Sequence, residues 1–180
     1  MQKTKGTFHV ETITFTALLV ALQVVLGNIL QVPLMEKQYN FGFLPIAVAG
    51  ALLGAPAAMI VGGLGDFLGA HLFPPGAYFP GFTLTNVLVG LVCGLVLYRR
   101  KPSIVRVIIT VAISLLVINW PLNSFWLKLM YSQSTRSYVG WLLMRGPNYI
   151  FEVPANTLLV YLCLRGLNRL DLPANMALRN

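Results

Sequence analysis

Long apolar segments, broken only by short polar connectors, run through almost the whole of this 180-residue chain. Several of them reach the roughly 18 apolar residues that a helix needs to cross a bilayer. A continuous apolar segment of this length indicates a helix, which makes all its backbone hydrogen bonds within the segment and so leaves none unpaired in lipid. We therefore predict an all-α integral membrane protein with six transmembrane helices. Their expected ranges are 12–30, 41–54, 56–72, 81–98, 103–130 and 148–166.

The chain has too few polar residues to cover a soluble domain. Charged residues make up 10% of it and hydrophobic residues 57%, whereas about 25% of the residues in a typical soluble domain are charged. No soluble domain or linker is left over, so we expect residues 1–180 to form a single transmembrane domain.

Most of the net charge of +8 comes from Lys and Arg residues that flank the apolar segments. Basic residues are retained on the cytoplasmic side of a membrane, so the groups at 3–5, 99–101 and 165–179 predict that both termini are cytoplasmic. We expect a multi-pass protein of the bacterial cell membrane, surrounded by the lipid bilayer. Nucleic acid is not an expected partner, because no binding motif or basic face is present. The external connectors are then 31–40, 73–80 and 131–147.

Sequence signatures of catalysis are missing. The chain has no Walker A loop for ATP, no cluster of residues with metal-ligand spacing and no Gly-x-Ser-x-Gly motif. We therefore expect neither enzyme activity nor a cofactor or metal, and ATP hydrolysis would belong to separate subunits. A small membrane enzyme built on Asp66, His71 and Glu152 is a weaker alternative, because no spacing supports it.

Asp66 is the most informative single residue, because it lies inside an apolar segment. An ionised carboxylate at the centre of a membrane helix costs at least about 2.5–3.5 kcal/mol, so this side chain should face a cavity or a partner. A carboxylate can accept two parallel hydrogen bonds from a planar edge with two N–H groups, such as a 2-amino-pyrimidinone. An internal pair within the bundle is the structural alternative. Glu152, the other acid in a span, could pair with Arg145 or contact a ligand.

The connector that follows combines three prolines with several aromatic rings. Prolines limit conformational freedom, so the rings of Phe73, Tyr78 and Phe79 would have little entropy left to lose on binding. Aromatic planes held in this way suit a flat heteroaromatic ligand, but an interfacial aromatic belt would use the same residue types. Further candidate binding residues on the external half are Asn123, Trp126, and two cations for a ligand carboxylate, Arg145 and Lys37.

Small residues recur four positions apart in several segments. This spacing puts them on one helix face, where two backbones can approach closely. Packing within the bundle explains most such pairs. Ala17 and Ala21 are the exception, because the first segment is otherwise bulky. We interpret them as a docking surface for another membrane protein.

The region from Asn40 to Leu95 resembles the central block of the folate-specific S-components of energy-coupling factor (ECF) transporters. The most specific part of the resemblance is the stretch FPPGAYFPGFTL. Further similarity lies at 12–21, at LNSFWL (122–127) and at MRGPNYIFEVP (144–154), so the resemblance covers most of the chain.

The resemblance implies a six-helix subunit that captures folate from outside. Its partners would be a transmembrane scaffold subunit (EcfT-type) and two ATP-binding-cassette ATPases. Ala17 and Ala21 match the strip that docks on the scaffold, and connector 31–40 matches the lid over the site. The flat pterin would meet Asp66 and the rings of Tyr78, Phe79 or Trp126. Asn123 and Arg145 match polar positions of the family, and the glutamate tail requires Arg or Lys near the mouth. The alternatives are an S-component for thiamine, pantothenate or a similar vitamin, and a stand-alone permease.

Overall fold

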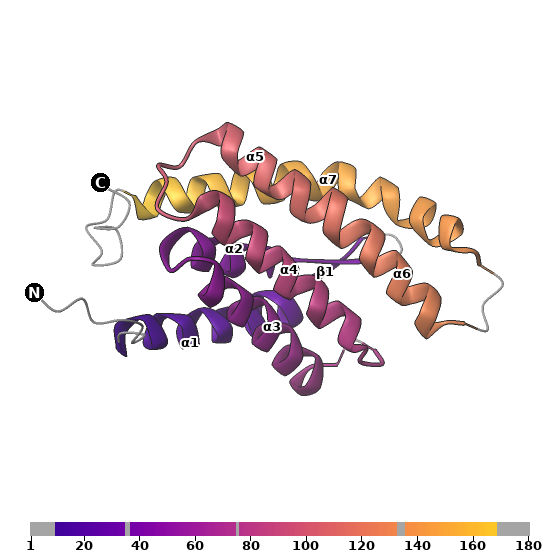
Figure 1. The fold of residues 1–180 in the computed structure, drawn as a ribbon. Coiled ribbons are helices and arrows are strands. Elements are labelled where there is room, and N and C mark those ends of the chain that lie inside the picture. The colour runs from indigo at the N-terminus through magenta and orange to yellow at the C-terminus, as the bar shows by residue number, and fades with distance from the viewer. Residues whose placement is uncertain (1–9, 35–36, 75, 133–135, 169–180) are drawn as a thin grey trace, which may run out of the picture.

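The structure is a computed structural model that describes residues 10–34, 37–74, 76–132 and 136–168. Two helices continue through a π-helical segment, α1 into η1 and α5 through η2 into α6 (Figure 1). The elements in chain order are α1 (Val10–Val24), η1 (Val25–Ile29), β1 (Gln31–Leu34), β2 (Lys37–Asn40), α2 (Phe43–Leu52), α3 (Ala55–Leu72), α4 (Pro80–Leu97), α5 (Ile104–Ala112), η2 (Ile113–Asn119), α6 (Trp120–Met130) and α7 (Tyr138–Leu167).

Five helical segments of the described chain are long and apolar enough to cross a membrane. They are Val10–Ile29, Ala55–Leu72, Pro80–Leu97, Ile104–Met130 and Tyr138–Leu167. The sixth helix, α2, has 10 residues, which at 1.5 Å per residue extends over about half of a bilayer core. This arrangement confirms the predicted all-α membrane fold. The break between α2 and α3 falls at Gly54, whose φ of 92° favours glycine, and Pro56 follows in the first turn of α3.

Glycine holds α2, α3 and α4 close together. A Cβ on Gly50 would lie 2.7 Å from the carbonyl carbon of Cys93, and one on Gly94 would overlap Ala55. These contacts are backbone against backbone, so neither glycine tolerates a side chain. Such close approach lets dispersion stabilise helices in a solvent that offers no hydrophobic driving force. The small-residue spacing seen in the sequence therefore serves packing inside the bundle at these positions.

The outside of the bundle is apolar, whereas its interior is mixed. Leu18 on α1, Leu95 on α4 and Ile150 on α7 are each more than 60% exposed. In a soluble protein such side chains would form a core. Here they face the hydrocarbon, as expected for a chain that spans the bilayer.

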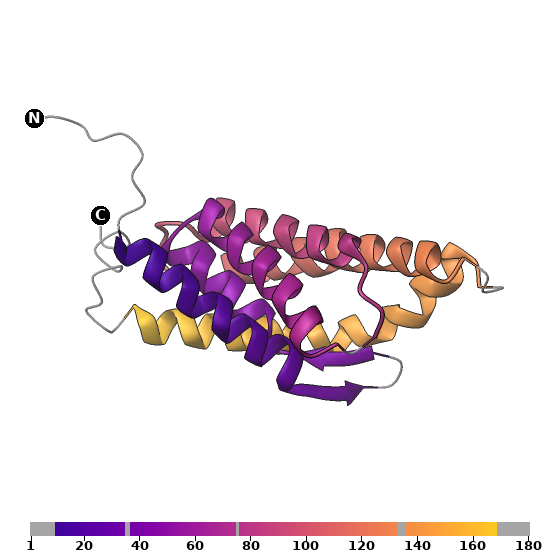
Figure 2. The same cartoon turned by 90° about the horizontal axis from the view of Figure 1, so that it is seen from below.

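The start of α1 and the end of α7 lie at one end of the bundle, and the hairpin β1–β2 lies toward the other (Figures 1 and 2). The exposed basic residues Arg99, Arg100 and Lys101 follow α4 at the first of these ends. The positive-inside rule makes that end cytoplasmic.

Two of the predicted external connectors contain regular structure. Residues 31–34 and 37–40 form an antiparallel hairpin, in which Gln31 pairs with Asn40 and Leu34 with Lys37. α7 begins at Tyr138, ten residues before the predicted 148, and Pro147 lies inside it. The indole N–H of Trp120 donates to the Leu142 carbonyl in the turn before this proline, at 2.9 Å. Packing against a neighbouring helix lets a membrane helix continue through a proline that the sequence alone indicates as a break.

Candidate functional site

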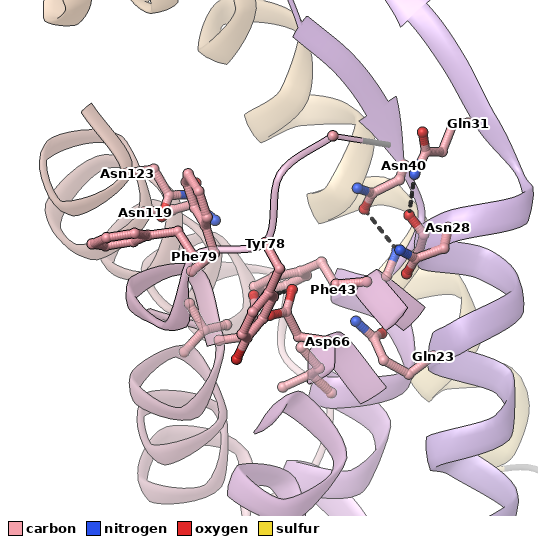
Figure 3. Close-up of a pocket in the computed structure, with 18 of the residues that line it drawn as sticks. Gln23, Asn28, Gln31, Asn40, Phe43, Asp66, Tyr78, Phe79, Asn119 and Asn123 are labelled. Atoms are coloured by element: carbon pink, nitrogen blue, oxygen red, sulfur yellow. Dashed lines mark hydrogen bonds between the residues drawn. The ribbon is translucent and has the colours of Figure 1, made fainter. Parts of the chain in front are cut away.

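A cavity of about 320 Å³ lies where η1, the hairpin, α2, α3, α4, η2, α6 and α7 meet (Figure 3). Two carboxylates, from Asp66 and Glu152, line it, and no Lys or Arg belongs to its described lining. Polar groups at this density are costly in a membrane protein and are typical of a binding site or pathway. Amides are the most frequent polar side chains of the lining: Gln23, Asn28, Gln31, Asn40, Asn86, Asn119, Asn123 and Asn156.

Asp66 stands on α3 with its carboxylate fixed by α4. Thr83 Oγ1 donates to Oδ2 at 2.6 Å, and Asn86 Nδ2 donates to Oδ1 at 2.9 Å. A carboxylate has about four acceptor positions, and each oxygen retains capacity beside its α4 partner. The two structural readings of Asp66 are therefore compatible, because the side chain is held by a neighbouring helix and also lines the cavity. The approach of α3 to α4 that makes these bonds depends on Gly62, where a Cβ would collide with the backbone of Asn86.

Aromatic rings of the 76–82 segment form one wall of the cavity. The Tyr78 hydroxyl lies 3.0 Å from Thr83 Oγ1, which links this ring to the Asp66 carboxylate. Phe79 packs against Trp126 with ring centroids 5.7 Å apart. Trp126 in turn donates from Nε1 to Thr85 Oγ1 at 3.0 Å. The wall is thus braced by hydrogen bonds and ring contacts behind it, which fixes the orientation of both front rings.

The opposite wall carries amides from α1, η1 and the hairpin (Figure 3). Gln23 is only 5% exposed, and its Oε1 has no hydrogen-bond partner among the described residues. A Cβ on Gly42 would lie 2.9 Å from Gln23 Nε2, so the end of the Gln23 side chain packs closely against this glycine. The Asn40 side chain accepts from Gly42 N at 3.1 Å, and the Gln31 side chain donates to Gly27 O at 2.9 Å. The hairpin is therefore tied to η1 and α2 beside the cavity.

A polar network on the α6 and α7 side orients two further asparagines. Asn119 Oδ1 accepts from Asn123 Nδ2 at 2.8 Å and from the Tyr149 hydroxyl at 3.0 Å. Arg145, which is 9% exposed, contacts the Tyr149 hydroxyl from behind. This network leaves the side-chain oxygen of Asn123 without a donor: Oδ1 is buried and has no hydrogen-bond partner within the described chain.

The structure brings four of the predicted binding residues to the cavity: Asp66, Tyr78, Phe79 and Asn123. Trp126 and Arg145 lie one layer behind its lining, and Phe73 is exposed just after the end of α3. The backbone of Lys37 lies in β2, but its side chain is outside the described structure. These residue roles stay predictions.

Sequence reasoning missed most of the amides. A signal was available, because Gln23, Asn28 and Asn86 interrupt otherwise apolar segments in the same way as Asp66. Uncharged amides cost less than a carboxylate in lipid, so each one alone is a weaker indication of a site.

A second, apolar groove lies on the outer surface between α1 and α3. Its volume is about 400 Å³, and Ala17 forms part of it together with Ile60 and Leu64. Ala21 is exposed one turn further along α1. The small side chains leave a strip on which another helix can approach closely.

Comparison with known proteins decides the family. The family described as "ECF transporter, substrate-specific component" matches residues 11–164. The chain belongs to the substrate-specific components of ECF transporters. This membership confirms the resemblance drawn from residues 40–95. It makes the S-component a substrate-binding subunit of the cell membrane and not the ATP-hydrolysing part of the transporter.

Two curated relatives are both named folate transporter FolT. The protein of Clostridium novyi (strain NT) is 33% identical over 127 residues, which cover 71% of the S-component and 74% of the relative. The protein of Leuconostoc mesenteroides is 35% identical over 116 residues, or 64% of the S-component and 62% of the relative. A crystal structure of FolT bound with folic acid superposes with a TM-score of 0.74 at 29% identity. The match covers 86% of the S-component and 91% of that chain.

Proposed function

We propose that this S-component binds folate in the 320 Å³ cavity and presents it to an ECF transporter for ATP-driven uptake. The observation that carries the proposal is the excess of hydrogen-bond acceptors in the cavity. Asp66 has acceptor capacity left, and Gln23 Oε1 and Asn123 Oδ1 have no partner among the described residues. An unpaired buried acceptor is costly, so the expected ligand is one that brings several N–H donors.

The pterin of folate fits this requirement. Its 2-amino-pyrimidinone edge presents parallel N–H groups, which suit a carboxylate such as Asp66. Its flat ring system suits the braced rings of Tyr78 and Phe79. In this proposal Asn123 accepts from another edge of the ring. Trp126 acts indirectly, because its ring supports Phe79. Arg145 also acts indirectly, because it contacts Tyr149, whose hydroxyl orients the asparagines of the cavity.

The charge of the lining indicates where the glutamate tail of folate would go. Asp66 lines the cavity, so a ligand carboxylate beside it would meet like charge. The described lining offers no Lys or Arg to offset this repulsion. We infer that the tail points outward past the hairpin, where Lys37 is the proposed cationic partner.

The family implies that the S-component works with an ECF module. We infer that the scaffold subunit of this module docks on the α1–α3 groove at Ala17 and on the exposed face at Ala21. Two ATP-binding-cassette ATPases would supply the energy, because the chain itself has no Walker A loop. This assignment separates the two surfaces, since the cavity binds the vitamin and the groove binds the transporter.

A ligand panel tests the proposal. The purified S-component is titrated without ATP with folic acid, thiamine and pantothenate, and binding is followed by the shift in thermal unfolding temperature. Folic acid is expected to stabilise the protein, because a ligand that binds only the folded state adds RT ln(1 + [L]/Kd). Stabilisation by thiamine or pantothenate but not by folic acid would assign the cavity to another vitamin. Vitamin uptake into liposomes that contain this chain alone would favour a stand-alone permease.

A further inference from the structure

The turn between α4 and α5 carries a concentrated positive charge that neither the cavity nor the α1–α3 groove uses. Arg99, Arg100 and Lys101 follow directly after α4 and are exposed, and Arg106 projects from the first turns of α5. None of these four cations forms an ion pair with a described residue. Their counter-charge must therefore come from outside the described part of the chain.

The carboxylates of the described chain lie elsewhere. Asp66 and Glu152 line the cavity, and no residue of the basic turn belongs to its lining. Glu11 lies in the first turn of α1, and α1 and α5 occupy opposite edges of the bundle (Figure 1). The groove that includes Ala17 belongs to the α1 edge, and its lining includes no residue of the basic turn.

The basic turn is ordered by specific contacts. Arg106 Nη1 donates to the Lys101 carbonyl at 2.8 Å, and the Arg99 guanidinium lies 5.1 Å from the centroid of the Tyr98 ring. The Arg99 backbone has φ of 53° and its N–H reaches Ala51 O at 3.4 Å. A non-glycine residue in the left-handed region is uncommon, and such strain persists only where the surrounding structure fixes it. The guanidinium groups are therefore presented from a defined loop.

The side chains beside the turn indicate what covers it. Leu95 on α4 is 66% exposed, and Ile104 and Val105 on α5 are 44% and 60% exposed. These residues face hydrocarbon, so the basic turn lies at the level where lipid headgroups meet water. Cationic clusters at this level on the cytoplasmic side attract anionic phospholipids, and the phosphate group matches the geometry of a guanidinium.

We propose that the α4–α5 turn is a binding site for an anionic phospholipid of the cytoplasmic leaflet. Arg99, Arg100, Lys101 and Arg106 contact the headgroup phosphate, and the exposed faces of α4 and α5 contact the acyl chains. The site is independent of the ligand in the cavity.

The experiment measures lipid binding to the purified protein by native mass spectrometry. Phosphatidylglycerol and phosphatidylcholine with identical acyl chains are titrated against the parent protein and the double variant Arg100→Gln/Lys101→Gln. The matched control is Lys128→Gln/Arg136→Gln, which removes the same charge at the other end of the bundle. We expect the parent to prefer phosphatidylglycerol by roughly tenfold or more. This preference should be lost in the first variant and kept in the control.

Three results would overturn the proposal. The first is an equal loss of preference in both double variants, which would indicate a general charge effect. The second is displacement of phosphatidylglycerol by the same concentration of inorganic phosphate, which would indicate a soluble anion. The third is unchanged lipid binding in Arg100→Gln/Lys101→Gln with loss of uptake by the assembled transporter, which would indicate an acidic protein partner. An unchanged thermal unfolding temperature shows that each variant is folded.

Discussion

Replacement of Asp66 by Asn removes the charge that we assign to ligand recognition while keeping the shape of the side chain. The fold should tolerate the change. In the parent, Asn86 Nδ2 lies 2.9 Å from Asp66 Oδ1. In the variant, the amide oxygen can keep this bond while the NH₂ group turns toward Thr83 Oγ1. A hydroxyl donates and accepts, so Thr83 can adapt to either partner. The α3–α4 contact is therefore retained in Asp66→Asn.

The N–H groups of the pterin edge can only donate, so the ligand cannot adapt to the new amide as Thr83 can. A hydrogen bond to a charged group contributes about 1.5–3 kcal/mol, and the amide presents an N–H donor where the carboxylate presented an acceptor. The loss of one such bond weakens folate binding roughly 10- to 150-fold, since about 1.4 kcal/mol corresponds to a factor of ten. The effect belongs to the ligand complex, so the stability of the free protein should change little.

Equilibrium titration with folic acid measures the effect, and Glu11→Gln is the matched control. Glu11 is an exposed carboxylate in the first turn of α1, remote from the cavity lining. Asp66→Asn should weaken binding and Glu11→Gln should not. A folate analogue that lacks the 2-amino group should lose less affinity in Asp66→Asn than folic acid does, because the two changes remove the same interaction. If Asp66→Asn binds folic acid within about twofold of the parent, the assignment of Asp66 to the pterin edge is refuted.

Three further predictions follow from other parts of the structure. Ala17→Trp fills the groove between α1 and α3, so ATP-driven uptake should be lost while folate binding by the isolated subunit is kept. Ile150→Trp, on an exposed position of α7 outside the groove, should keep both, and loss of binding in Ala17→Trp would contradict the docking role. Gly65→Ala places a Cβ against a buried α1 side chain. It should cost about 1–3 kcal/mol of folding free energy in chemical denaturation, whereas Gly166→Ala, with nothing within 4 Å, should cost none. Tyr149→Phe removes the hydroxyl that orients a cavity asparagine at 3.0 Å, so we expect a loss of folate affinity of about 0.5–1.5 kcal/mol. Unchanged affinity in Tyr149→Phe would mean that the network does not orient the site.

The membrane fold could be predicted from the sequence, because a bilayer allows few structures. Apolar segments of sufficient length must be helical, and prolines and glycines at Gly54–Pro56 indicate where one helix stops and the next begins. The exact start of α7 was not predictable in this way. Pro147 reads as a break in an isolated segment, but packing against Trp120 carries the helix through it.

The candidate site was predictable only in part. Asp66 and the rings of Tyr78 and Phe79 are conspicuous as single residues in an apolar chain, and all three line the cavity. The amides are not conspicuous one at a time, because their effect depends on several helices turning them toward the same space. Gln23 and Asn156 come from α1 and α7, which are far apart in the sequence.

Arg145 is a residue that the sequence indicates as a ligand contact but that does not line the cavity. The sequence indicates a cation near the external end, and this cation was expected to receive a ligand carboxylate. The structure turns its side chain toward Tyr149, one layer behind the cavity. The side of α7 that faces the cavity depends on how this helix packs against its neighbours, which the sequence alone does not give. The role of Arg145 toward a ligand stays a prediction.

The central claim is that this single chain recognises folate with the cavity described above and needs no ATP to do so. Isothermal titration of the purified S-component with folic acid, in detergent and without nucleotide, tests it most directly. We predict saturable binding with a stoichiometry of one folate per chain, greatly weakened in Asp66→Asn. Absence of heat and of saturation with folic acid, in protein that unfolds cooperatively, would contradict the claim.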